Sequence, residues 1–355
     1  MELLTCYRAI RDGETPPASD PPPVRYADFV AAELETLADE DSSAYWRDVV
    51  TGHAKLTLPA AWKDPRGGRE PYRIQIPLFD QDAGLRRLAA EAGTPLKSVL
   101  LAAHLKVMSG LTHERAFHTG LVCDTRPEVL GADRVLGMFI NTVPFPHEQR
   151  ASTWRDLVRD VFAAETRMWP HRRFPLPAVQ RELAGGRQLV EVYFNYLDFT
   201  VVDTGLVDLP DSVDISPNEF PLSVTVLGGL LTLTSRPEVL AAEQAARLAE
   251  RYRAVLDAMA ADPYGDALAA RLVPGERERL LQGPPELPRP PVTALEVFEE
   301  TARLLPDAVA VTTWDGGALT YAELDARANQ VAWELRGRGP GRRPSSGSAW
   351  TAGPT

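Results

Sequence analysis

A stretch rich in proline, glycine and charged residues divides this chain of 355 residues into two unequal parts. It runs from about Asp262 to Pro291 and has room for only one short helical piece. Proline lacks a backbone donor and fixes φ, so such a run is typical of a semi-rigid linker. The sequence therefore predicts one large folding unit before the linker and a smaller one from about Val292.

Apolar periodicity predicts that helices and strands alternate irregularly along the large unit, as in a mixed α/β (α+β) layered sandwich. The predicted strands cover residues 72–78, 117–124, 142–146 and 189–199, followed by a hairpin over 221–235 that turns at Gly228 and Gly229. The predicted helices cover residues 3–11, 26–37, 80–93, 94–107 and 240–261, with one more begun by Ser42 and one through Trp154 and Phe162. Thr94 is the expected N-cap of the helix over 94–107. Trp154, Phe162 and Trp169 are expected in the core.

Composition excludes several classes of function. The formal net charge of −11 disfavours binding to nucleic acid or to an anionic membrane surface. Cys6 and Cys123 are too few for a disulfide framework and have no metal-ligand spacing. The first residues do not read as a signal peptide, and no run is apolar enough to span a bilayer, so a cytoplasmic protein is expected.

The segment LGMFINTVPFP, residues 136–146, places a glycine and an Asn-Thr pair inside an apolar run. A glycine there indicates a backbone that passes close to something else, and an asparagine indicates a polar anchor. Gly137, Asn141 and Thr142 are therefore candidate site residues.

Five segments resemble, in order and approximate spacing, parts of a nonribosomal peptide synthetase. The segments YADFVA (26–31), TGLVCDTRPEV (119–129), LGMFINTVPFP (136–146) and VEVYFNYLDF (190–199) resemble its condensation domain. ALTYAELDARANQVAWELRGRG (318–339) resembles the opening of the adenylation domain that follows condensation in those assembly lines.

The resemblance implies a fold of two chloramphenicol-acetyltransferase-like lobes with a tunnel between them. It implies amide formation between two thioesters, both carried on the phosphopantetheine arms of peptidyl or acyl carrier domains, which would be the partners. No cofactor is expected to be bound covalently. The residues implied at the tunnel or the lobe interface are Gly137, Phe139, Asn141, Thr142, Asn195 and His171; a surface-loop role for His171, or local backbone bonds for the two asparagines, remain alternatives.

The family's catalytic signature, His-His-x-x-x-Asp-Gly, is absent from this sequence. Its six histidines, His53, His104, His113, His118, His147 and His171, include no adjacent pair. No catalytic residue is therefore assigned, and no metal site is expected. The resemblance also implies that Arg126 pairs with the aspartate of that signature, so here it would lack its partner; a solvated loop residue or a pair with Asp124 is the alternative.

The implied division is a remnant of the first lobe over 1–70, the second lobe over 71–262, a linker over 263–291 and a truncated adenylation start over 292–339. Residues 340–355 are polar and patternless, and a frameshift near 340–344 is one hypothesis for them. No Gly-x-x-x-x-Gly-Lys run occurs, so ATP binding is not expected.

Three functions follow from these observations. The first is a fragment of a peptide synthetase that is inactive on its own because the catalytic histidine is missing. The second is a module that docks carrier domains without catalysis, or a split condensation domain that needs a separate first lobe. The third is a stand-alone acyltransferase of the same superfold, using coenzyme A or a carrier.

Overall fold

The computed structural model describes residues 2–17, 22–197, 220–269, 272, 275–282, 293–313 and 317–337. The chain divides into two compact units, Met1–Glu278 and Arg279–Thr355, and the division falls inside the stretch predicted as a linker. The aberrant tail predicted over 340–355 lies outside the described residues.

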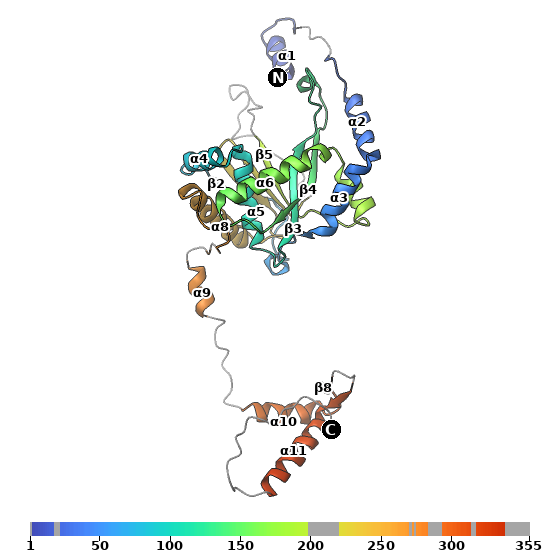
Figure 1. Ribbon diagram of the computed structural model, residues 1–355, viewed down its shortest axis with the longest axis vertical. Helices are drawn as coiled ribbons and strands as arrows, with labels where there is room; N and C mark the ends of the chain where they lie inside the picture. The colour runs from blue at the N-terminus through green and yellow to red at the C-terminus, as the bar shows by residue number, and fades with distance from the viewer. Residues whose placement is uncertain are drawn as a thin grey trace. The chain divides into compact units, whose positions relative to one another are not determined.

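The first unit is built on a mixed seven-stranded sheet (Figure 1). In the described residues the strand order is β1-β3-β5-β6-β7-β2, with β4 paired to β3. The β1–β3, β3–β5 and β5–β6 pairs are parallel, and the β3–β4, β6–β7 and β2–β7 pairs are antiparallel. The strands are β1 Ala54–Lys55, β2 Tyr72–Pro77, β3 Ala116–Asp124, β4 Ile140–Glu148, β5 Val192–Leu197, β6 Leu222–Leu227 and β7 Leu230–Ser235.

The α-helices of this unit are α1 Glu2–Arg11, α2 Tyr26–Ala38, α3 Glu40–Gly52, α4 Asp82–Ala92, α5 Leu96–Ser109, α6 Trp154–Met168, α7 Leu176–Ala178 and α8 Ala242–Ala261. The 3₁₀ turns are η1 Ala60–Trp62, η2 Ala132–Arg134 and η3 Trp169–His171, and η4 Val179–Leu183 is a π-helical turn. The last helix, α9 Glu276–Gln282, spans the division between the two units.

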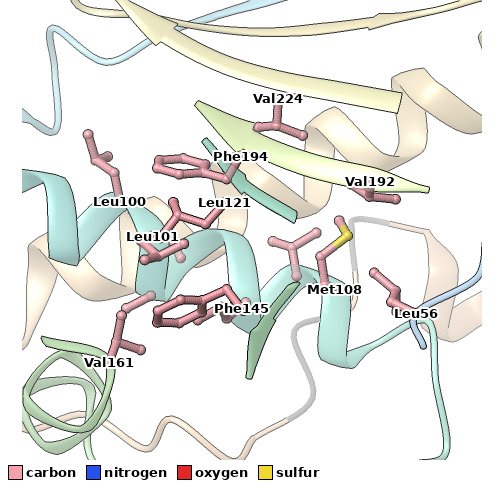
Figure 2. Close-up of a cluster of buried hydrophobic side chains, with 14 of the residues drawn as sticks. Leu56, Leu100, Leu101, Met108, Leu121, Phe145, Val161, Val192, Phe194 and Val224 are labelled. Atoms are coloured by element: carbon pink, nitrogen blue, oxygen red, sulfur yellow. The ribbon is translucent and has the colours of Figure 1, made fainter. Parts of the chain in front are cut away.

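Helices α4, α5, α6 and α8 pack together and cover one face of the sheet. Figure 2 shows Leu100 and Leu101 of α5 beside Leu121 of β3 and Phe194 of β5, and all four are buried. Successive side chains of a strand point to opposite faces of the sheet. Thr119 of β3 and Phe194 of β5 therefore face α5, whereas Gly120 and Asn195 face the opposite side.

The second unit contains α10 Ala294–Leu304, β8 Val309–Thr312, β9 Ala318–Thr320 and α11 Tyr321–Gly337. Strands β8 and β9 pair antiparallel. Thr293 begins α10 with a capping box that includes Glu296. Among the residues described here, no side chain of these four elements is fully buried.

Two predicted caps are wrong. Helix α5 begins after Pro95, and the hydroxyl of Thr94 has no hydrogen-bond partner in the part of the chain that the structure describes. Helix α3 begins after Asp39, whose carboxylate accepts from the backbone N–H of Ser42. In each case a neighbouring residue with extended backbone takes the cap position.

The prediction that Phe162 and Trp169 lie in the core is also wrong, since they are 37% and 39% exposed. Trp154 is fully buried, as expected.

Candidate functional site

The chain between β3 and β4, residues 125–139, carries three of the predicted site residues and is called the β3–β4 connection. Thr125 anchors its two ends, because its N–H and its hydroxyl both donate to the carbonyl of Phe139 at 2.7 Å. This brings Arg126 and Phe139 side by side, with the guanidinium carbon 4.1 Å from the centre of the ring.

Within the described residues, the guanidinium of Arg126 binds backbone carbonyls rather than a carboxylate. Its guanidinium donates to the carbonyls of Ala132 and Val135 at 2.6 and 2.7 Å. The carboxylate of Asp124 accepts from the backbone N–H of Arg126 rather than from the guanidinium. The cation therefore stabilises the turn of the connection, and a role for it toward a further aspartate stays a prediction.

Gly137 and Phe139 pack against helix α2. Phe139 is buried in a small cluster with Phe29 and Val135, and its ring meets the rings of Phe29 and Tyr26 edge to face. The Tyr26 hydroxyl donates to the carbonyl of Met138 at 3.1 Å. These two predicted residues thus join the β3–β4 connection to α2.

Asn141 at the start of β4 forms a polar anchor, as its position in the apolar run indicated. Its amide nitrogen donates to the carbonyls of Arg172 and Phe174 at 2.9 and 2.8 Å. Its amide oxygen accepts from the backbone N–H of Leu176 at 3.2 Å. All of these bonds are to the backbone that follows α6, which matches the local alternative left open for this residue.

Thr142 and Asn195 lie on the face of the sheet opposite α5. Thr142 pairs with Val122 of β3. Gly120, two residues before Val122, pairs with Tyr193 of β5. Tyr193 and Asn195 share a face because side chains alternate along a strand. The structure therefore brings these two predicted residues to one face, whereas Asn141 points to the other.

A row of polar side chains continues across this face. Asn195 pairs with Thr225 of β6, Thr225 with Thr232 of β7, and Thr232 with Gln75 of β2. The side chains of Asn195, Thr225 and Thr232 are half-buried, and within the described ranges they make no hydrogen bond. This set of four residues is called the polar row.

Sequence reasoning missed most of the polar row, although a signal was present. The segments LSVTVL and LLTLTS alternate apolar residues with Ser or Thr at period two. That pattern indicates a strand with one polar face. What it cannot give is the register that aligns Thr225, Thr232 and Gln75 with Asn195.

Arg172 contacts the end of β3 and the start of the β3–β4 connection. Sequence reasoning did not identify this residue. Its side chain is 6% exposed, donates to the carbonyls of Asp124 and Trp169, and pairs with Glu128. The guanidinium lies 4.0 Å from the centre of the Trp169 ring. The ion pair and the stacking together hold the end of β3 and the start of the β3–β4 connection.

His171 lies between α6 and α3 rather than beside the polar row. Its ring stacks on Tyr45 at 4.5 Å, and its Nδ1 hydrogen-bonds to the hydroxyl of Ser42 at 2.9 Å. Burial lowers its pKa, an effect opposed by Asp39 and Asp41. The structure thus separates His171 from Asn195 and Thr142.

Three other histidines are buried and poorly suited to proton transfer. Burial lowers the pKa of His104 to about 3 and those of His118 and His147 to about 4. His104 also hydrogen-bonds to the hydroxyl of Tyr252 at 2.7 Å. A base with so low a pKa and so little access contributes little near neutral pH.

No group of three or more His, Cys, Asp or Glu side chains in the described ranges is arranged to hold a metal ion. Cys123 is buried, which raises its pKa to about 12 and leaves the thiol protonated. None of the helices in the described ranges has the length and apolarity needed to cross a membrane.

Comparisons with known proteins agree with this fold. Residues 1–281 match the family model of the condensation domain. The AMB antimetabolite synthetase AmbE of Pseudomonas aeruginosa is 33% identical over 292 residues, which cover 76% of this chain and 13% of that protein. The chain therefore spans a small part of the length of this relative.

Two solved structures share the fold. The nonribosomal peptide synthetase FmoA3 superposes with a TM-score of 0.61 at 22% identity, covering 92% of this chain and 37% of the other. The first condensation domain of the CDA synthetase gives 0.59 at 23% identity, covering 75% of this chain and 61% of the other. The mixed sheet with helices packed on it is thus a condensation-domain fold, as predicted. The chain belongs to the condensation-domain family of nonribosomal peptide synthetases.

Proposed function

We propose that this chain supplies the second lobe of a condensing enzyme, which forms an amide bond between two carrier-bound thioesters. The observation that carries the proposal is the polar row together with Thr142, on the face of the sheet away from α5. Side chains with unused donors and acceptors on one face can orient a substrate that carries amides, such as a phosphopantetheine arm.

Exposed apolar side chains on the β3–β4 connection support a partner surface. The exposed fractions are 94% for Leu130, 89% for Leu136 and 69% for Met138. Leu34 on α2 adds a further exposed leucine at 60%. Exposed apolar side chains on one surface mark interaction sites. We propose that a first condensation lobe binds at these residues.

We propose that the chain alone forms no amide. The reaction needs a base that removes a proton from the attacking amine, and the sequence contains no His-His pair. His104, His118 and His147 are buried with lowered pKa values, and His171 is engaged with Ser42 and Tyr45. A separate lobe carrying the His-His-x-x-x-Asp-Gly loop would supply this base, and Arg126 would meet its aspartate.

The second unit extends the proposal. Its helix α11 contains most of the segment that resembles the opening of an adenylation domain, and Trp333 and Leu335 there are 71% and 63% exposed. We propose that this unit, predicted over 292–339, is the start of such a domain. It contains no phosphate-binding loop, so ATP turnover by this chain is not expected.

Reconstitution tests the proposal. The purified chain, a separately expressed first lobe with the histidine loop, and two carrier domains loaded with an acyl and an aminoacyl group are mixed, and the amide product is measured by mass spectrometry. We expect product only when both lobes are present. The control is the same mixture with the second histidine of the loop replaced by alanine.

Product from the chain alone would contradict the proposal and favour a stand-alone acyltransferase. The low basicity of the buried histidines favours a second candidate, a module that binds carrier domains without catalysis. That candidate predicts a complex with a loaded carrier by size-exclusion chromatography, and no product in any mixture.

A further inference from the structure

We propose that a cavity at the start of β3 binds a small molecule that carries a phosphate group. The cavity has a volume of about 1000 Å³ and lies between the end of α3, β1, the first residues of β3 and the segment 187–189. It is separate from the polar row, and the proposal is independent of the proposed function.

The walls of the cavity supply donors. Lys55, Arg115 and Arg187 line it, together with one carboxylate, Glu114. In a chain with a net charge of −11, a cavity with three cations and one acid is locally basic. A ligand that satisfies such walls must bring acceptor oxygens and negative charge.

Two of these cations are available to a ligand. The guanidinium of Arg115 makes no hydrogen bond or ion pair with any described residue. Arg187 uses its Nε to donate to the carbonyl of Ala184 at 3.0 Å, which leaves its two terminal amino groups. Lys55 is different, because it pairs with Glu191 at 2.8 Å and is largely neutralised.

Two guanidinium groups on one cavity favour phosphate over a single carboxylate. Each guanidinium presents a planar fork that can bind two oxygens of the same group. A phosphate ester has enough oxygens and charge to engage both forks. The cavity is also far larger than a phosphate ion, and Val50 and Leu189 give it apolar wall, so an organic body is expected on the phosphate.

His118 gives a second, independent indication of a ligand. It lines the cavity, is 1% exposed, and its Nδ1 has no hydrogen-bond partner among the described residues. Buried polar atoms are almost always paired, so an unpaired one marks a place where water or a ligand completes the structure. Burial, with a smaller effect from nearby His53 and Lys55, lowers the pKa of His118 to about 4, which keeps the ring neutral near pH 7.

Isothermal titration of the full chain with phenyl phosphate tests the proposal, with phenol and inorganic phosphate as comparison probes. We expect phenyl phosphate to bind more tightly than either. The double variant Arg115→Gln/Arg187→Gln should weaken that binding at least about tenfold, and each single variant should weaken it by less. Raising the salt from about 50 mM to about 500 mM should also weaken it, since it screens exposed charges.

The matched control is Arg181→Gln, which removes an exposed arginine that pairs with Glu182 and does not line the cavity. It should bind phenyl phosphate as the unaltered chain does. Circular dichroism and the melting temperature establish that each variant is folded, and the single variants give the answer should the double variant unfold. Equal binding of phenol, equal binding of inorganic phosphate, or unchanged binding by the folded arginine variants would overturn the proposal.

Discussion

The ring of Tyr26 occupies the space that a side chain at Gly137 would need. A Cβ at position 137 would lie 2.2 Å from Cδ2 of Tyr26 and 2.4 Å from its Cε2. The close backbone approach indicated by this glycine in the sequence is therefore an approach to α2. Because Gly137 belongs to the β3–β4 connection, this contact fixes how two segments more than a hundred residues apart meet.

Replacing Gly137 by alanine should loosen α2 from the β3–β4 connection. The added methyl group must displace the Tyr26 ring and disturb its contacts with Phe29 and Phe139, at a cost of about 1–3 kcal/mol. Hydrogen exchange of the amides of α2 should become faster. The control is Gly52→Ala, since no atom of the described residues outside helix α3 and the adjoining residue lies within 4 Å of a Cβ there. Equal exchange in both variants would show that the contact contributes nothing.

Replacing Asn141 by leucine should destabilise the first unit. The variant leaves the carbonyls of Arg172 and Phe174 and the N–H of Leu176 without their partner. Unpaired groups of this kind cost about 1–3 kcal/mol each, so a loss of at least about 3 kcal/mol is expected in urea unfolding. Thr142→Val is the control, because its hydroxyl makes no hydrogen bond in the described ranges, and its change should stay below about 1 kcal/mol.

Acid should destabilise the first unit between about pH 6.5 and pH 4. The pKa values of His104, His118 and His147 are lowered by burial to about 3, 4 and 4. The unfolded chain therefore binds more protons in this range, and stability falls as the pH falls. Each histidine contributes up to about 1.4 kcal/mol per pH unit.

Urea unfolding measured at pH 7.5, 6 and 5 checks this dependence. His104→Gln should flatten it, because one buried titrating group is removed, whatever its effect on stability at pH 7.5. His113→Gln, at an exposed position, is the matched control variant. A free energy of unfolding that stays constant from pH 7.5 to 5 would contradict the burial of these rings.

Local chemistry made much of the fold predictable. Gly93 ends α4 with φ of 70°, and Gly228 and Gly229 turn the β6–β7 hairpin at positive φ, as their sequence positions indicated. The buried face of α8, with Leu248, Tyr252 and Val255, follows from helical periodicity.

The site was less predictable because its geometry depends on long-range register. Period-two patterns give a polar face to each strand but not which threonine meets Asn195. Phe162 shows a related limit: its spacing fits the apolar stripe of α6, but its side chain is 37% exposed. Likewise, the sequence around Arg172 does not indicate that its side chain would reach Asp124 and Glu128.

Substitutions in the polar row should slow amide formation in the two-lobe mixture without loss of stability. Asn195→Leu and Thr232→Val remove donors and acceptors that make no hydrogen bond within the described chain, so the fold should tolerate them. If these groups hold substrate in the transition state, each loss should lower kcat/KM by about tenfold. Thr166→Val on the exposed side of α6, where the hydroxyl donates to the Phe162 carbonyl, is the control. Unchanged kcat/KM in both row variants would remove the polar row from the reaction, while product formation that still required both lobes would leave the assignment of the second lobe intact.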